Sequence, residues 1–252
     1  MRRIAIVAAL ACLAGAPARA ITGNATSAPN GGRHAVMIVG TGGSFCTGAA
    51  IARDLVLTAA HCVEPGADYK LVEFDAAHKP RLLEVRRIVR HPQFNLQTLL
   101  GHRATADLAL LKLAAPLPAA VVPAALAHSD RAPQPGDRYT VTGYGVAVHG
   151  DGKTGGTLRA ATLAATGKPG NLQIRLVDPA TNGERAGLGA CTGDSGAPVY
   201  DGAAQIGQII GVVSWSTGPN LSAGCGGLTG VTPITLYRGW IVETAKKMES
   251  PL

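Results

Sequence analysis

Three short segments each place a reactive side chain beside an apolar run: "LTAAHC" carries His61, "ADLALLKL" carries Asp107 and "CTGDSGAP" carries Ser195. A serine hydroxyl is a weak nucleophile at neutral pH, so a base with a pKa near the working pH must accept its proton, and histidine suits that task. A carboxylate behind the imidazole would hold its tautomer and stabilise the imidazolium. Each residue taken singly is more often structural than catalytic. Together they indicate acyl transfer through a nucleophilic serine.

The elements that would position these residues are short strands. Glycine (33) and proline (16) are frequent, and the apolar runs "HAVMIVG", "DLVLTA", "LALLKL", "RYTVTGYGV" and "QIIGVVSW" stand between turn residues. Such spacing is typical of a barrel or sandwich. The proline-rich stretch 114–137 predicts a linker between two β units of about a hundred residues each. Near the end, "PITLYRGWIVETAKKM" predicts a helix with Leu236, Trp240, Ile241 and Ala245 on one face.

At this point the chain resembles the chymotrypsin-like (trypsin-like) serine peptidases, whose His, Asp and Ser come in this order and in these contexts. The resemblance extends to "RHPQFN" (90–95), "VTGYG" (141–145), "VVSWS" (212–216), "GVT" (230–232) and the terminal "WI". It implies an all-β fold of two antiparallel Greek-key β-barrels with a C-terminal α-helix. The expected bounds are about 21–120 for the first barrel, 135–233 for the second and 234–248 for the helix, within a peptidase domain over 21–252.

The resemblance also assigns roles in the reaction. His61, Asp107 and Ser195 would form the catalytic triad of an endopeptidase that works through an acyl-enzyme. Ser214 matches the residue that supports the aspartate, although it could equally be an ordinary strand serine. The backbone N–H groups of Gly193 and Ser195 would form the oxyanion hole, and losing one such donor typically costs about 2.7 to 4 kcal/mol of transition-state stabilisation.

The same resemblance places a pocket for the side chain that precedes the cleaved bond. Its floor would be Gly189, and Ser214, Trp215, Ser216 and Gly230 would line its walls. Without an acid at the floor, a buried Lys or Arg would lack a charge partner. A side chain at Ser216 makes the pocket shallower, so we expect cleavage after small or medium apolar residues.

Two departures from the family pattern bear on that pocket. Ala197 stands where the family usually has glycine, and a positive φ there would cost about 1 to 2 kcal/mol. The segment 216–225, "STGPNLSAGC", is long and borders the pocket. It could reshape the floor.

Four cysteines follow the leader. Cys46 and Cys62 flank the histidine segment, while Cys191 and Cys225 flank the serine segment. Three pairings are possible from the sequence alone. The resemblance selects Cys46 with Cys62 and Cys191 with Cys225.

No cofactor or metal is expected. The cysteines form no CxxC pair, which disfavours metal ligation. Glu73 and Asp75 fall near a calcium loop of some relatives, but two acids in a loop are more often simply solvated.

Residues 1–20, "MRRIAIVAALACLAGAPARA", have the three parts of a secretory signal peptide. A lipid-modified Cys12 is the weaker alternative, because the apolar run before it is very short. Removing Arg2, Arg3 and Arg19 leaves 20 of the 23 basic residues against 16 acidic ones, a net charge of +4. We expect a secreted monomer that meets protein or peptide substrates and protein inhibitors, with no membrane anchor and no nucleic-acid partner.

The leader ends at "PARAITGN", just before Ile21. In the family the mature N-terminus is an apolar residue whose ammonium group pairs with the acid before the nucleophile, here Asp194. Signal-peptide removal would itself release that amine, so we expect no separate zymogen stage. The alternative is that Ile21 is a frayed terminus. At the level of the whole protein, a non-catalytic binding module and an esterase without peptidase activity remain open.

Overall fold

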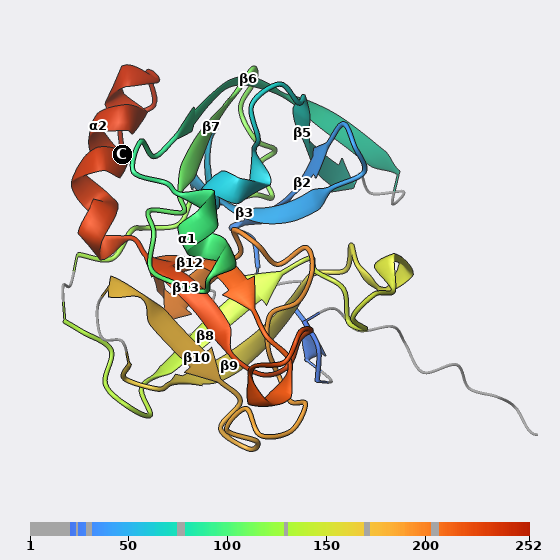
Figure 1. Ribbon diagram of the computed structural model, residues 1–252. Helices are drawn as coiled ribbons and strands as arrows, with labels where there is room; N and C mark the ends of the chain where they lie inside the picture. The colour runs from blue at the N-terminus through green and yellow to red at the C-terminus, as the bar shows by residue number, and fades with distance from the viewer. Residues whose placement is uncertain are drawn as a thin grey trace, which may run out of the picture.

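Two antiparallel β-barrels of six strands each lie one above the other in Figure 1. The structure is a computed structural model, and it describes residues 21–23, 25–28, 32–74, 79–128, 131–168, 172–202 and 207–252. The expected leader, residues 1–20, lies outside these ranges. The two barrels and the helix that follows them confirm the fold class expected from the sequence.

The N-terminal barrel closes in the order β2-β3-β4-β7-β6-β5. Its strands are β2 (Ala35–Gly40), β3 (Phe45–Ala52), β4 (Leu55–Thr58), β5 (Tyr69–Phe74), β6 (Pro80–Arg90) and β7 (Ala109–Leu113). Neighbouring strands are consecutive in the chain except where β5 pairs with β2 and where β7 returns beside β4 in the Greek-key crossover. This crossover brings the end of "LVLT" beside the start of "ALLKL".

The C-terminal barrel repeats this plan, in the order β8-β9-β10-β13-β12-β11 with β11 pairing back to β8. Its strands are β8 (Arg138–Gly143), β9 (Arg159–Ala165), β10 (Ile174–Val177), β11 (Pro198–Asp201), β12 (Gln208–Ser216) and β13 (Thr229–Pro233). A two-residue strand, β1 (Thr26–Ser27), pairs with β9 from outside the ring. The N-terminal segment is therefore attached to the second barrel.

Three apolar clusters hold the molecule together. One fills each barrel, with Leu111 in the first and Leu163 in the second fully buried. The third joins Leu57 of β4, Val212 of β12 and Ile241 of the last helix, so it lies between the barrels. Side chains from both barrels share this cluster, which fixes one barrel against the other.

The C-terminal helix α2 (Arg238–Lys247) follows a single 3-10 turn, η5 (Thr235–Tyr237), so it begins later than the sequence suggested. Ile241 and Ala245 are fully buried as expected, whereas Leu236 is 45% exposed because it belongs to the turn. The helix lies beside the N-terminal barrel in Figure 1 although it follows the C-terminal one in the chain.

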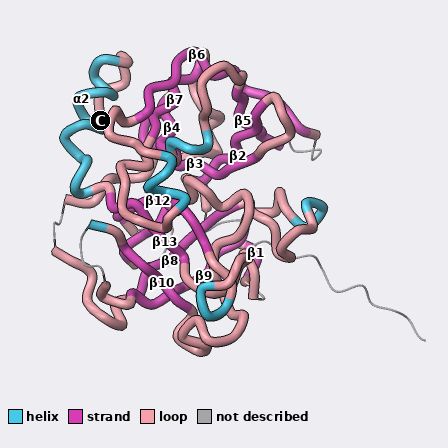
Figure 2. The backbone as a smooth tube through the Cα atoms, in the orientation of Figure 1, coloured by secondary structure: helices cyan, strands magenta, loops and turns pink. Residues whose placement is uncertain are grey.

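Short helical turns interrupt the loops, which Figure 2 separates from the strands by colour. They are η1 (Ala60–Cys62), α1 (Leu96–Leu100), η2 (Gly152–Thr154) and η4 (Pro219–Leu221). Asn95 caps α1, since its side-chain oxygen accepts a hydrogen bond from the N–H of Thr98 at 2.9 Å. None of the helices in the described ranges is long and apolar enough to cross a bilayer.

Candidate active site

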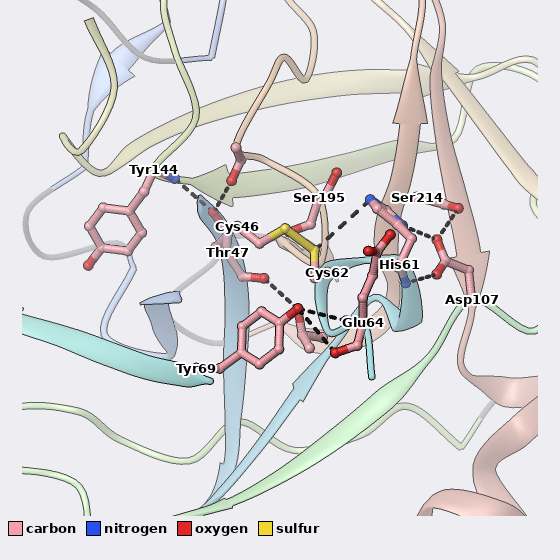
Figure 3. The surroundings of a disulfide bond; sticks show 12 residues. Cys46, Thr47, His61, Cys62, Glu64, Tyr69, Asp107, Tyr144, Ser195 and Ser214 are labelled. Atoms are coloured by element: carbon pink, nitrogen blue, oxygen red, sulfur yellow. Dashed lines mark hydrogen bonds and ion pairs between the residues drawn. A yellow bond between two sulfur atoms is a disulfide. The ribbon is translucent and has the colours of Figure 1, made fainter. Parts of the chain in front are cut away.

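The histidine and the aspartate come from neighbouring strand ends. His61 lies on η1, just after β4, and Asp107 lies just before β7. Because Thr58 of β4 pairs with Ala109 of β7, the two side chains meet. His61 Nδ1 lies 2.8 Å from Asp107 Oδ2, and the backbone N–H of His61 donates to Asp107 Oδ1 at 3.0 Å (Figure 3).

Asp107 is fully buried and its carboxylate is well supplied with donors. Ser214 Oγ, from β12 of the other barrel, donates to Asp107 Oδ2 at 2.6 Å. With the carboxylate ionised, Nδ1 of the imidazole carries the hydrogen, which leaves Nε2 as the acceptor. The geometry therefore orients His61 as a base.

Ser195 lies on the loop that precedes β11 and is held by both barrels. Its carbonyl accepts a hydrogen bond from the N–H of Thr47 on β3, at 2.9 Å. The next residue, Gly196, donates its N–H to Val213 O at 2.7 Å. Ser195 and His61 line one cavity of about 580 Å³. No hydrogen bond joins Ser195 Oγ to His61 Nε2 among the described contacts, a bond that often tightens only with substrate bound.

Gly193 adopts a left-handed backbone with φ of 92°. A Cβ at this position would lie 2.1 Å from Cε2 of Phe45, and Thr47 Oγ1 donates to its carbonyl at 2.8 Å. The conformation and the close approach both require glycine here. Thr47 and Phe45 of the N-terminal barrel thus hold the backbone of Gly193 in place.

Ala197 does not carry the strain that its departure from the family pattern suggested. Positive φ values occur at Gly193 and Gly196, but not at Ala197. The side chain of Ala197 is fully buried among the apolar residues of the second barrel. An alanine fits this position because its backbone is ordinary.

The specificity pocket stays a prediction, but the structure places Thr229, and not Gly230, beside the predicted floor residue Gly189. Gly230 does not face Gly189; a Cβ at Gly230 would lie 2.1 Å from the Trp215 indole. The residue before it, Thr229, is fully buried, and its Oγ1 would lie 3.5 Å from a Cβ at Gly189 while accepting a hydrogen bond from Ala190 N at 3.0 Å. Thr229 therefore adjoins the predicted floor residue.

The substrate cavity itself is lined on this side by Cys191, Thr192, Val213, Trp215 and Ser216. Gly189 and Gly230 are not among its lining residues. The long segment after Ser216 turns away, since the Asn220 N–H donates to Gly183 O at 2.8 Å. It brings no acid to the cavity.

Ile21 and Asp194 are both fully buried in the second barrel. The adjoining residue, Thr22, donates its N–H to Gly189 O at 3.2 Å, which ties the N-terminal segment to the pocket floor. The N–H groups of Gly145 and Cys191 donate to the Asp194 carboxyl at 2.8 and 2.9 Å. Ile21 is thus packed in the core of the second barrel, and its role as the mature N-terminus stays a prediction.

Burial raises the pKa of Asp194 to about 7. The two backbone N–H donors oppose this, as does the charge of Arg159, itself nearly fully buried. Because Ala20 precedes Ile21 in this sequence, the Ile21 nitrogen is an uncharged amide. The raised pKa describes the carboxyl without an ammonium partner.

Two disulfides have the expected pairing, Cys46–Cys62 with S–S of 2.05 Å and Cys191–Cys225 with S–S of 1.97 Å. Cys46, Cys62 and His61 form the group of close metal-type ligands in the described chain. Both of its sulfurs are in the disulfide, so it is not a metal site. Glu73 is described, but Asp75, the second candidate calcium ligand, lies outside the described residues.

The sequence did not point to four residues around the site, which come from strands or loops far apart in the chain. Phe45 lines the cavity, Thr229 adjoins Gly189, and His102 and Arg175 contact the Trp215 ring. Thr229 could have been found by counting back from "WI" to "TGVT" without a gap. That count assigns the predicted wall position to Thr229 in place of Gly230. The others have no short motif.

Known proteins are similar to this chain in sequence and fold. The family model described as Trypsin matches residues 21–241. A trypsin of Phaedon cochleariae is 31% identical over 216 residues, covering 79% of this chain and 78% of its own. Human kallikrein-15 is 30% identical over 227 residues, covering 80% and 82%.

Two solved structures resemble this one. Neuropsin, a serine protease expressed in the limbic system of mouse brain, has a TM-score of 0.66 at 23% identity, covering 86% of this chain and 96% of its own. Human heparin binding protein has a TM-score of 0.67 at 26% identity, covering 88% and 94%. Fold, site and sequence together define a two-barrel serine hydrolase. The chain belongs to the trypsin family of serine endopeptidases, enzymes that act on peptide bonds.

Proposed function

We propose that this chain is a serine endopeptidase in which Ser195 attacks the peptide carbonyl. The Ser195 Oγ–C bond forms as His61 Nε2 takes the hydroxyl proton, and the same proton then leaves with the amine when the C–N bond breaks. A water molecule then attacks the acyl-enzyme through the same steps and releases the enzyme. The observation that carries this proposal is the hydrogen-bonded set of His61, Asp107 and Ser214 beside Ser195.

The developing oxyanion would be bound by the N–H groups of Gly193 and Ser195. The backbone of Gly193 is held in place by the Thr47 hydrogen bond and by the Phe45 ring. Fixed donors of this kind stabilise the tetrahedral intermediate without reorganising during the reaction.

The preferred side chain before the cleaved bond is small or medium and apolar. Gly189 offers no charge, Thr229 lies beside it, and Ser216 lines the cavity. A Lys or Arg side chain would be buried there without a counter-ion, at a cost of several kcal/mol.

The enzyme acts outside the cell or in the periplasm, and export itself completes its site. The two disulfides suit an oxidising compartment. Cleavage before Ile21 would free an ammonium group inside the second barrel. The Asp194 carboxyl is buried there and accepts hydrogen bonds from the backbone N–H groups of Gly145 and Cys191. The pairing would need no further peptidase.

A fluorophosphonate probe tests the proposal. The mature protein should be labelled, and Ser195→Ala should lose labelling completely while His61→Ala loses most of it. Equal labelling of the three proteins would contradict the mechanism. A peptide-cleavage profile then tests the pocket, and preference for Lys or Arg would show that the floor has been misassigned.

A non-catalytic binding module is the main competing function, since human heparin binding protein shares the fold. The intact hydrogen bonds of His61, Asp107 and Ser214 favour turnover instead. Failure of the probe to label the correctly processed protein would favour the binding role. Hydrolysis of activated esters without any peptide cleavage would favour an esterase.

A further inference from the structure

We propose that the cleft selects an acidic side chain two to four residues before the cleaved bond, and that Arg175 binds it. The inference rests on the proposed peptidase function and narrows its substrates to peptides with Asp or Glu on the acyl side. It comes from a row of residues that crosses three strands of the second barrel.

Arg175, Gly230 and Trp215 form that row. Arg175 of β10 pairs with Gly230 of β13, which in turn pairs with Trp215 of β12. Residues directly opposite each other in neighbouring strands point to the same face of a sheet. Because Gly230 has no side chain, the indole occupies the space that its Cβ would fill. The Arg175 guanidinium carbon consequently lies 5.6 Å from the centroid of the Trp215 ring.

Trp215 is also part of the catalytic cleft, since it lines the same cavity as His61 and Ser195. The pairing of β11 with β12 ends at Val212, so the last residues of β12 have β13 as their strand neighbour on one side only. An extended peptide can add to such an edge through backbone hydrogen bonds. At about 3.3 Å per residue, the residues that precede the cleaved bond would pass over Trp215 toward Arg175.

The charge of Arg175 is available to a ligand. Within the described residues its N–H groups donate to neutral acceptors, Gln173 Oε1 and His102 O, both at 3.3 Å, and it forms no ion pair. A guanidinium has five donors in a planar fork that matches a carboxylate. Several donors are therefore left for a substrate, next to an aromatic surface that excludes water.

The indole adds a second donor without a partner. Trp215 is 8% exposed, and its Nε1 has no hydrogen-bond partner among the described residues. His102 stacks on the ring, with centroids 4.6 Å apart. An unmade hydrogen bond at a buried donor costs about 1 to 3 kcal/mol. An acceptor oxygen brought by the substrate would remove that cost if His102 shifts aside.

Peptides that differ only in charge test the inference. The set has Ala before the cleaved bond and carries Asp, Asn, Glu, Gln or Lys at one of the three preceding positions. At one position the mature enzyme should show at least a tenfold higher kcat/KM for Asp or Glu than for the matching amide. Arg175→Gln should reduce this ratio to about one, and Arg175→Glu should favour Lys. Arg138→Gln, which removes an exposed arginine from β8 of the same barrel, should leave it unchanged.

A binding measurement separates this inference from the proposed function. The chain has two tryptophans, so Ser195→Ala combined with Trp240→Phe leaves Trp215 as the fluorophore. Acidic peptides should change its emission at lower concentration than the amide peptides do, and Arg175→Gln should abolish the difference. If the probe fails to label the wild type, the peptidase function is wrong, yet this titration still decides the inference. Equal binding of both peptides, or a preference that survives Arg175→Gln, would overturn it.

Discussion

At the residue scale, the position of Thr229 predicts that its side chain limits the depth of the proposed pocket. This side chain is fully buried, and its Oγ1 would lie 3.5 Å from a Cβ at Gly189. Adding or removing one methylene in an apolar pocket changes discrimination by about 1 to 3 kcal/mol. Thr229→Gly should therefore raise kcat/KM for Phe peptides relative to Ala peptides by roughly tenfold or more.

Steady-state kinetics on a matched pair of peptides, with Ala or Phe before the cleaved bond, measure this ratio. Thr232→Gly serves as the control, since Thr232 lies on the same strand and is also buried. An unchanged ratio in Thr229→Gly would show that the side chain does not limit the pocket.

At the element scale, a partly buried ion pair anchors the chain that follows α2. Lys112 of β7 is 8% exposed, and its Nζ donates to Asp54 Oδ2 and Ser250 Oγ, both at 2.6 Å. Burial alone would raise the pKa of Asp54, but the hydrogen bonds from Lys112 and Ser250 outweigh it, so the pKa is lowered. The end of the helix is thus bound to the N-terminal barrel.

Lys112→Met should lower the free energy of unfolding at pH 7 by roughly 1.5 to 3 kcal/mol, the range for hydrogen bonds to charged groups. The depressed pKa of Asp54 means that the pair stabilises the protein above pH 4 and less as Asp54 becomes protonated. The loss measured by urea unfolding should therefore shrink at pH 3.

Lys70→Met provides the comparison for this experiment. Lys70 pairs with Glu84 at 2.8 Å, but the two side chains are 39% and 62% exposed, so its removal should cost less than about 1 kcal/mol. Equal losses in the two variants would mean that the buried network adds nothing beyond a surface pair. Both variants are best made with Ser195→Ala to prevent self-digestion.

His61, Asp107 and Ser195 could be predicted because each lies in a short, local motif, "LTAAHC", "ADLALLKL" and "CTGDSGAP". The two β units were predicted from the apolar runs and the proline-rich stretch 114–137. The pocket wall was placed on Gly230 because strand register cannot be read from a three-letter motif, and a shift of one residue moves a side chain to the opposite face. The row of Arg175, Gly230 and Trp215 could not be predicted for the same reason, because it forms only when three strands that are separated along the chain pair with one another.

At the scale of the whole molecule, the proposed reaction would depend on holding two barrels together. His61 and Asp107 come from the first barrel, whereas Ser195 and Ser214 come from the second. The apolar cluster between the barrels and the Thr47 hydrogen bonds fix their relation. The N-terminal segment adds one more connection, because Ile21 is buried in the same apolar cluster as Ala190 and Ala197, which lie on either side of Gly193 and Ser195 in the chain.

The raised pKa of Asp194 should make the pairing with Ile21 detectable as a change in the pH dependence of stability. Without a free ammonium group its pKa is raised by burial to about 7, whereas an unfolded chain has the ordinary value of 3.8. Between these values the folded state binds a proton that the unfolded state does not, so the contribution of Asp194 to stability is highest below pH 4 and falls as pH rises to about 7. An ammonium partner at Ile21 would keep the carboxylate ionised and remove this fall.

Two forms of Ser195→Ala, one beginning at Ile21 and one retaining Ala20 in front of it, isolate the effect. Urea midpoints at pH 5 and pH 8 should differ more for the form with Ala20, since groups common to both forms contribute equally. Asp194→Asn in the Ala20 form should lose the extra pH dependence, because an amide does not titrate there.

The same variant in the otherwise active enzyme should abolish activity with Ser195 present, since a buried ammonium would then lack its carboxylate. Identical pH dependence in the two forms would contradict the pairing of Ile21 with Asp194, and export could then not complete the site by releasing that amine.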